Sequence, residues 1–148
     1  MINLEEGLII YFDPFYFKNG NTAKSKYFVV IKKINDETIL ASLPTSKDCI
    51  PENLLIDDGC IEESSIGVNC FTFSEKTTVT NCGKCFPRKT FIYGVQLDTY
   101  NHKHLVENYI IEGVDYIVFG KMRKQIFQEL ISCLKNSKIV KRKFKRML

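Results

Sequence analysis

The sequence predicts a mostly β fold of the α+β class that ends in a helix. Short aromatic and β-branched segments, separated by turn residues, fill the first two thirds of the 148 residues. After Gly120 the apolar residues change to the spacing of an amphipathic helix. Roughly five to seven short strands with one or two helices fit a small, curled β-barrel better than a parallel sheet.

The clearest predicted strand covers residues 26–32, which are aromatic or β-branched between flanking lysines. A turn then returns the chain into a hairpin partner that Pro44 ends. The first strand is expected to end at the turn signal Asp13-Pro14, and Gly94 is expected to form a bulge in the last strand. Strands are expected at 7–12, 26–32, 38–43 and 89–97, with one or two more short strands within 69–80.

One domain is expected over 1–148, because neither a repeat nor a low-complexity linker interrupts it. The barrel covers about 5–97, with an irregular stretch at 44–68. Asp98 or Thr99 is expected to cap a short helix at about 99–110. A terminal basic helix follows at about 121–146, with its apolar positions at helical spacing.

Charge is distributed unevenly along the chain. Residues 121–148 carry ten Lys or Arg and one acid, a local +9, whereas the whole chain is +4 and residues 1–120 are therefore −5. A basic end on an acidic body indicates an anionic partner, or else a solvated helix face. The apolar stripe of the helix should pack on the barrel, so only the chain from Lys135 onward is expected to be free for a partner.

The sequence lacks a run of about 20 apolar residues that could cross a bilayer. Its acidic start lacks the basic and apolar regions of a secretory signal. We therefore expect a cytoplasmic protein that makes no membrane contact.

Three elements near the start of the chain carry a family resemblance. They are Gly7-Leu8-Ile9-Ile10, then Lys26 before Tyr-Phe-Val-Val-Ile, then Leu43-Pro44-Thr45-Ser46-Lys47. Over roughly residues 5–47 this order resembles the MazF/PemK-like toxin domain (also called Kid/CcdB-like), an SH3-like barrel of type II toxin–antitoxin systems. The terminal helix is also placed as in that family.

The resemblance implies an endoribonuclease that cleaves single-stranded RNA without a metal or other cofactor. It also implies an antitoxin protein as partner, and a homodimer. By position, Lys26 falls where the family usually has an arginine followed by proline, and Thr45 or Ser46 falls on the catalytic hydroxyl. Tyr27 replaces that proline. A lysine holds a phosphate as a point charge and orients it less than an arginine does.

The chemistry of RNA cleavage needs cations and hydroxyls near the phosphate. Lys24, Lys26 and Lys47 are expected around one end of the hairpin, with hydroxyls from Thr22, Thr45 and Ser46. The alternative is that residues 44–48 are only a turn that ends a strand. Further RNA-binding candidates are Lys18 and Tyr16 in the first loop, and Lys141, Arg142, Lys143, Lys145 and Arg146 in the tail.

Two other function classes compete with the nuclease. One is a catalytically silent SH3-like module that binds RNA or a partner protein through the aromatic loop 15–26 and the basic tail, and the lysine at position 26 favours it. The other is a phage-defence or regulatory protein whose barrel assembles only with a neighbouring chain.

The six cysteines need an account of their own. Without a secretory signal we expect reduced thiols or metal ligands and not disulfides. Cys82 and Cys85 have the two-residue spacing of a zinc knuckle, and Cys60 with Cys70 could complete four ligands. The alternatives are a redox pair or plain buried thiols. Cys133 lies on the apolar stripe of the terminal helix and is expected in the core.

Overall fold

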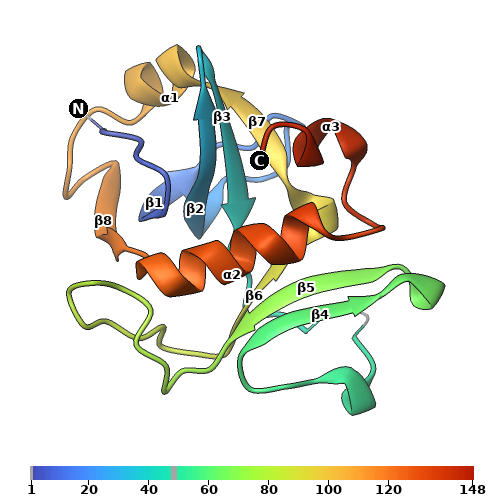
Figure 1. Ribbon diagram of the computed structural model, residues 1–148. Helices are drawn as coiled ribbons and strands as arrows, with labels where there is room; N and C mark the ends of the chain where they lie inside the picture. The colour runs from blue at the N-terminus through green and yellow to red at the C-terminus, as the bar shows by residue number, and fades with distance from the viewer. Residues whose placement is uncertain (1, 48–49) are drawn as a thin grey trace.

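The computed structural model describes residues 2–47 and 50–148, and its fold is mostly β with three α-helices among the described residues (Figure 1). Two antiparallel sheets have the strand orders β7-β3-β2-β1-β8 and β4-β5-β6, and α2 crosses between them. The strands are β1 Leu8–Phe15, β2 Lys24–Ile34, β3 Glu37–Ser42, β4 Gly59–Glu63, β5 Val68–Phe73, β6 Thr90–Tyr93, β7 Asp98–Asn101 and β8 Tyr116–Lys121. The helices are α1 His102–Asn108, α2 Lys124–Lys135 and α3 Arg142–Lys145, with short 3₁₀ turns η1 Glu52–Leu54, η2 Ser64–Ile66 and η3 Gly94–Gln96.

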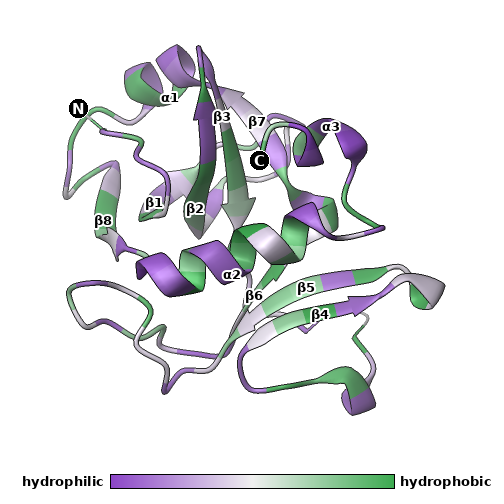
Figure 2. Cartoon of the chain, viewed as in Figure 1, coloured by the Kyte–Doolittle hydropathy of each residue, from purple (hydrophilic) through white to green (hydrophobic). Residues whose placement is uncertain are grey.

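The five-stranded sheet is apolar on both faces because each face covers a separate core. Along β1, Ile9 packs with β5 and α2, whereas its neighbour Ile10 packs with Phe28 and α1 on the opposite face. The three-stranded sheet adds Phe71 and Phe73 to the first of these cores. Figure 2 shows α2 as a mixture of hydrophilic and hydrophobic residues, and its buried Leu130 and Leu134 belong to that core.

The α+β class is confirmed, and the closed SH3-like barrel stays a prediction. Strands β2, β3 and β5 lie within a few residues of their expected positions. The expected end of β1 was wrong, since this strand continues through Asp13 and Pro14 to Phe15. Its pairing with β2 shifts between Phe12 and Phe15, and such an irregularity accommodates a proline that has no N–H to donate.

Several local expectations were wrong because pairing with distant strands decided the structure. Strands β4 and β8 were not expected. Of the one or two strands expected at 69–80, one forms, β5, and Thr80 beyond it forms an isolated bridge with Met122. Residues 98 and 99 start β7 and do not cap a helix; Asn101 Oδ1 caps α1 by accepting the N–H of His104. Gly94 begins η3 and forms no bulge.

The basic tail is folded onto the body. The helix α2 ends at Lys135, and Val140, which precedes α3, lies in the first core together with Phe144 of α3. The break has a local cause, because Ser137 Oγ accepts the N–H groups of Ile139 and Val140 at 2.9 and 3.2 Å. The expectation of a chain free from Lys135 onward was therefore wrong.

A disulfide joins Cys60 of β4 to Cys133 of α2, across 73 residues of sequence. The expectation of reduced thiols or metal ligands was thus wrong for these two cysteines. Cys133 is buried as expected, and the packing of α2 on β4 brings the two Cα atoms to 5.6 Å. Cys49 lies outside the described residues. Among the helices of the described chain, none is long and apolar enough to cross a bilayer.

Candidate functional site

A pocket of about 640 Å³ opens on the five-stranded sheet between β2, β3, β7 and the loop after β1. Alternation along the strands explains its floor, because every second side chain points to the same face. Lys24, Lys26 and Phe28 come from β2, and Leu40 with Ser42 come from β3. We call it the lysine pocket; its other lining residues are Phe17, Asn19, Asn21, Thr22, Gln96, Asp98 and Tyr100.

The two lysines on β2 give the pocket a cationic wall. Both ammonium groups lie over the ring of Phe17, with Lys24 Nζ at 5.9 Å and Lys26 Nζ at 5.7 Å from its centroid. Phe17 is half-buried, so its ring forms an apolar side of the pocket next to these charges. A cationic wall beside an aromatic ring suits a phosphate with an attached planar base.

The opposite side of the pocket is acidic and phenolic. Asp98 Oδ1 pairs with Lys18 Nζ at 3.0 Å, and the same ammonium group lies 4.6 Å from the Tyr100 ring centroid. Burial, followed by the charge of Asp98 and the proximity of Tyr109, raises the pKa of Tyr100 to about 12. Tyr100 therefore keeps its proton at neutral pH and can donate a hydrogen bond.

Hydroxyl and amide groups complete the lining. Ser42 Oγ donates to Gln96 Oε1 at 3.4 Å, and Thr22, Asn19 and Asn21 lie in the loop above. The pocket thus has two cations, a carboxylate and several neutral donors. Such a set can bind a phosphodiester, and the carboxylate can accept a proton from a hydroxyl.

The structure brings only part of the predicted site together. Lys24, Lys26 and Thr22 line the pocket, whereas Thr45 and Ser46 are exposed outside its lining. The segment that holds them turns toward β6, where Pro44 O accepts from Phe91 N and Ser46 O accepts from the Tyr93 hydroxyl at 2.6 Å. Lys47 forms an ion pair with Glu52 instead of facing the pocket.

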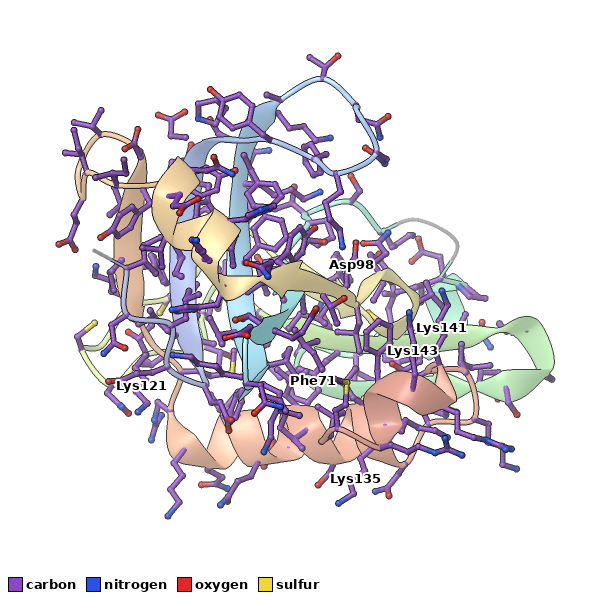
Figure 3. All side chains as sticks on the ribbon, turned by 90° about the horizontal axis from the view of Figure 1, so that it is seen from above. Phe71, Asp98, Lys121, Lys135, Lys141 and Lys143 are labelled. Atoms are coloured by element: carbon purple, nitrogen blue, oxygen red, sulfur yellow. A yellow bond between two sulfur atoms is a disulfide. The ribbon has the colours of Figure 1, made fainter. Side chains whose placement is uncertain are left out.

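The remaining RNA-binding candidates lie outside the lining of the pocket. Lys18 forms an ion pair with Asp98, which lines the pocket. Tyr16 is exposed, and its ring stacks on that of Tyr109 with the two ring centroids 6.3 Å apart. In the tail, Lys145 Nζ donates to Ser137 O at 2.6 Å, while Lys141, Arg142, Lys143 and Arg146 are exposed. Figure 3 shows Lys141, which precedes α3, and Lys143 of α3; both views place α3 beside the chain that leads from η3 into β7 and Asp98.

The cysteines do not form the zinc set that their spacing suggested. Cys60 is bonded to Cys133, so its sulfur is not available as a thiolate ligand, and Cys70 is buried in β5. Cys82 Sγ lies 3.2 Å from Thr80 Oγ1, and Cys85 Sγ lies 4.0 Å from Thr78 Oγ1. Within residues 2–47 and 50–148, no group of three or more His, Cys, Asp or Glu is arranged to hold a metal ion.

Sequence reasoning missed Ser42, Gln96, Asp98 and Tyr100 as parts of the site. Asp98 and Tyr100 alternate along β7, and this period of two was the available signal. The prediction of a helix cap at 98–99 obscured it. Ser42 and Gln96 are brought to the pocket by tertiary packing, and a local pattern does not reveal that.

In comparisons with known proteins, the chain matches no family model and no curated protein.

Proposed function

We propose that this chain binds single-stranded RNA in the lysine pocket and cleaves it, as an endoribonuclease of the MazF/PemK-like toxin type. One observation carries the proposal: Lys24 and Lys26 project from alternate positions of β2 into one pocket that also holds an aromatic ring and a carboxylate. The family resemblance over residues 5–47 supports the same assignment. An antitoxin and a second copy of the chain belong to the proposal as partners.

In the proposed reaction the RNA 2′-oxygen attacks the adjacent phosphorus atom. Asp98 accepts the 2′-hydroxyl proton, and the ammonium groups of Lys24 and Lys26 stabilise the charge on the non-bridging oxygens. The bond from phosphorus to the 5′-oxygen breaks, and this oxygen takes a proton from solvent. The products are a 2′,3′-cyclic phosphate and a 5′-hydroxyl end, so neither a metal nor a cofactor is required.

A silent RNA-binding module is the second candidate. The ion pair between Lys18 and Asp98 favours it, because the carboxylate oxygen that would accept the 2′-hydroxyl proton is already occupied by an ammonium group. The exposed position of Thr45 and Ser46, away from the lysines, favours it as well. The two candidates share binding in the lysine pocket and differ only in bond cleavage.

The test measures binding and cleavage separately. Purified protein is incubated with mixed single-stranded RNA, with and without Mg²⁺, and new 5′-hydroxyl ends are counted; affinity for a 2′-O-methyl oligonucleotide is measured by fluorescence anisotropy. Lys26→Ala should weaken binding roughly tenfold, since a hydrogen bond to a charged group is lost. Asp98→Asn should stop cleavage and leave binding nearly intact, and Thr45→Ala tests the hydroxyl that the resemblance implies.

Lys33→Ala is the matched control, because Lys33 is exposed on the same strand and does not line the pocket. Binding without cleavage by the wild type would establish the silent module. If Lys26→Ala and Lys33→Ala bind RNA equally well, the lysine pocket is not the binding site and the proposal fails.

A further inference from the structure

A second pocket, of about 290 Å³, lies next to the lysine pocket and has a different chemistry. We call it the Tyr93 pocket; its lining is Ile50, Gly67, Val68, Asn69, Tyr93, Val95 and Gln96. Ile50, Val68 and Tyr93 are buried and give it an apolar floor, whereas Val95 is 57% exposed at its rim. Its volume is near the roughly 300 Å³ at which small-molecule pockets begin.

Two features connect the Tyr93 pocket to the lysine pocket. Gln96 lines both of them. Ser42 lines the first pocket, and four residues later Ser46 O accepts a hydrogen bond from the hydroxyl of Tyr93, which lines the second pocket. Thr45 and Ser46 are exposed on this short segment between the two pockets.

The lining of the Tyr93 pocket selects the chemistry of its occupant. Among the residues that the structure describes, this lining contains no Lys, Arg, Asp or Glu, and it therefore offers a phosphate no cation. The apolar floor suits a planar, uncharged ring, and the exposed amide of Gln96 can form hydrogen bonds with the edge of a base. Asn69 Nδ2 already donates to Glu62 Oε1 and Cys133 O, which fixes that side of the pocket.

We propose that the Tyr93 pocket is a base-recognition subsite, which holds the nucleobase of a nucleotide adjacent to the phosphate bound by Lys24 and Lys26. The inference rests on the proposed RNA binding and adds the source of its sequence preference. The strand passes from the lysine pocket over Gln96, with Thr45 and Ser46 along its path. Phosphate contacts in the first pocket give affinity, and the second pocket discriminates between bases.

The experiment uses a fluorescein-labelled tetranucleotide of 2′-O-methyl RNA, which the protein cannot cleave, and four versions with one abasic position each. For the wild type we expect one abasic position to lower affinity roughly tenfold, the effect of losing one stacked base. Val68→Phe, which fills the pocket from its floor, should bind the complete tetranucleotide about tenfold more weakly and lose the dependence on that position. Thermal unfolding verifies that this variant is folded.

Val95→Ala keeps the test decisive if Val68→Phe does not fold, because Val95 is an exposed rim residue. Val95→Ala should lower the affinity for the complete tetranucleotide several-fold. It should lower the affinity less for the tetranucleotide that is abasic at the sensitive position. Val114→Ala is the matched control, since Val114 is similarly exposed and lines neither pocket.

The outcomes separate this inference from the proposed function. A wild type that binds RNA, with a base dependence that neither Val68→Phe nor Val95→Ala changes, overturns the subsite and leaves RNA binding in place. A wild type that binds no tetranucleotide overturns both. Loss of affinity in Lys24→Ala that is equal for complete and abasic RNA assigns phosphate binding to the lysine pocket, as the inference requires.

Discussion

Gly94, the first residue of η3, lies where three parts of the fold meet. A Cβ atom added to it would come within 2.6 Å of Val140 Cγ2 and closer still to Asn69 Oδ1. Neither neighbour can easily move, because Asn69 is held by hydrogen bonds to Glu62 and Cys133 O, and Val140 is buried. The close approach of backbone and side chains, and not a special φ, requires glycine here.

We predict that Gly94→Ala destabilises the protein by roughly 1–3 kcal/mol, the usual cost of inserting a methyl group into a packed core. Urea denaturation followed by circular dichroism measures the free energy of unfolding. Val95→Ala, one residue away but exposed, is the control and should change stability by less than about 0.5 kcal/mol. In a Val140→Ala background the cost of Gly94→Ala should fall, and equal costs in both backgrounds would contradict the steric account.

At the same scale, the sequence allowed Lys24 and Lys26 to be named, but not Asp98 and Tyr100, which line the pocket with them. Alternation along a strongly β-branched segment is a local signal, so two lysines at a spacing of two are visible without a structure. Asp98 and Tyr100 depend on whether residues 98–101 form a strand or a helix start, and the pairing of β7 with β3 decides this. Thr45 was predicted in the site only because of its position in the family resemblance. In the structure, Pro44 O accepts a hydrogen bond from Phe91 N of β6, which holds this segment at β6.

Among the elements, α2 is joined to β4 by packing, by the Cys60–Cys133 disulfide and by Glu62. Glu62 Oε1 accepts from Ser137 Oγ and Asn69 Nδ2, and its Oε2 accepts from Lys138 N at 2.8 Å. Burial opposes ionisation of Glu62, but these hydrogen bonds, with the charge of Lys145, prevail and lower its pKa. The carboxylate thus caps the chain that leaves α2.

We predict that loss of the disulfide lowers the free energy of unfolding by roughly 2–4 kcal/mol, because the cross-link closes a long loop in the unfolded chain. The test compares wild type with and without dithiothreitol, and with Cys60→Ser, in urea denaturation. The reductant should destabilise the wild type and leave Cys60→Ser unchanged. Cys82→Ser, which removes an exposed thiol outside the disulfide, should keep the sensitivity of the wild type.

Mass spectrometry provides an independent measurement. Digestion of unreduced protein should release the peptides that contain Cys60 and Cys133 as one linked species. If both cysteines are instead fully alkylated before reduction, the bond is absent from the purified protein and the stability prediction loses its basis.

The sequence did not reveal β4 and β8. Both are strands because they pair with another strand, and not because of their own residues. β4 buries only Ile61 and has two adjacent acids, so its own residues favour a loop; pairing with β5 makes it a strand. β8 is an edge strand between two helical patterns, and its pairing with β1 lies far away in sequence. The terminal helix was predicted to continue to about residue 146, but α2 ends at Lys135. The Ser137 hydroxyl accepts the next backbone N–H groups, and the sequence pattern does not show this.

On the scale of the whole molecule, the fold holds the basic C-terminal segment against the rest of the protein, with most of its cations exposed. Val140 and Phe144 dock the tail, so its exposed cations occupy fixed positions on α3 instead of a loose end. Val140, just before α3, lies close to Gly94 of η3, and Figure 3 shows Lys141 and Lys143 near the chain that leads from η3 into β7 and Asp98. A charged surface of this kind attracts phosphate without reading sequence.

With the proposed RNA binding, this arrangement predicts how the affinity for RNA depends on salt. The logarithm of the association constant falls with the logarithm of salt concentration by about 0.7 for each phosphate contact on a single strand. Replacing Lys141, Arg142 and Lys143 together by alanine should therefore make the slope shallower by about 2, if each contacts a phosphate. Affinities of variant and wild type should converge at high salt, while the preference between bases stays the same.

The matched control replaces Lys33, Lys76 and Lys103, which are exposed, line neither pocket and change the net charge equally. Fluorescence anisotropy titrations with one long oligonucleotide, from low to high salt, give both slopes. An equal change in the control would mean that net charge alone attracts RNA, without a defined surface. A tail variant with the slope of the wild type would remove α3 from the RNA path and restrict binding to the two pockets, because only cations that contact phosphate release counterions.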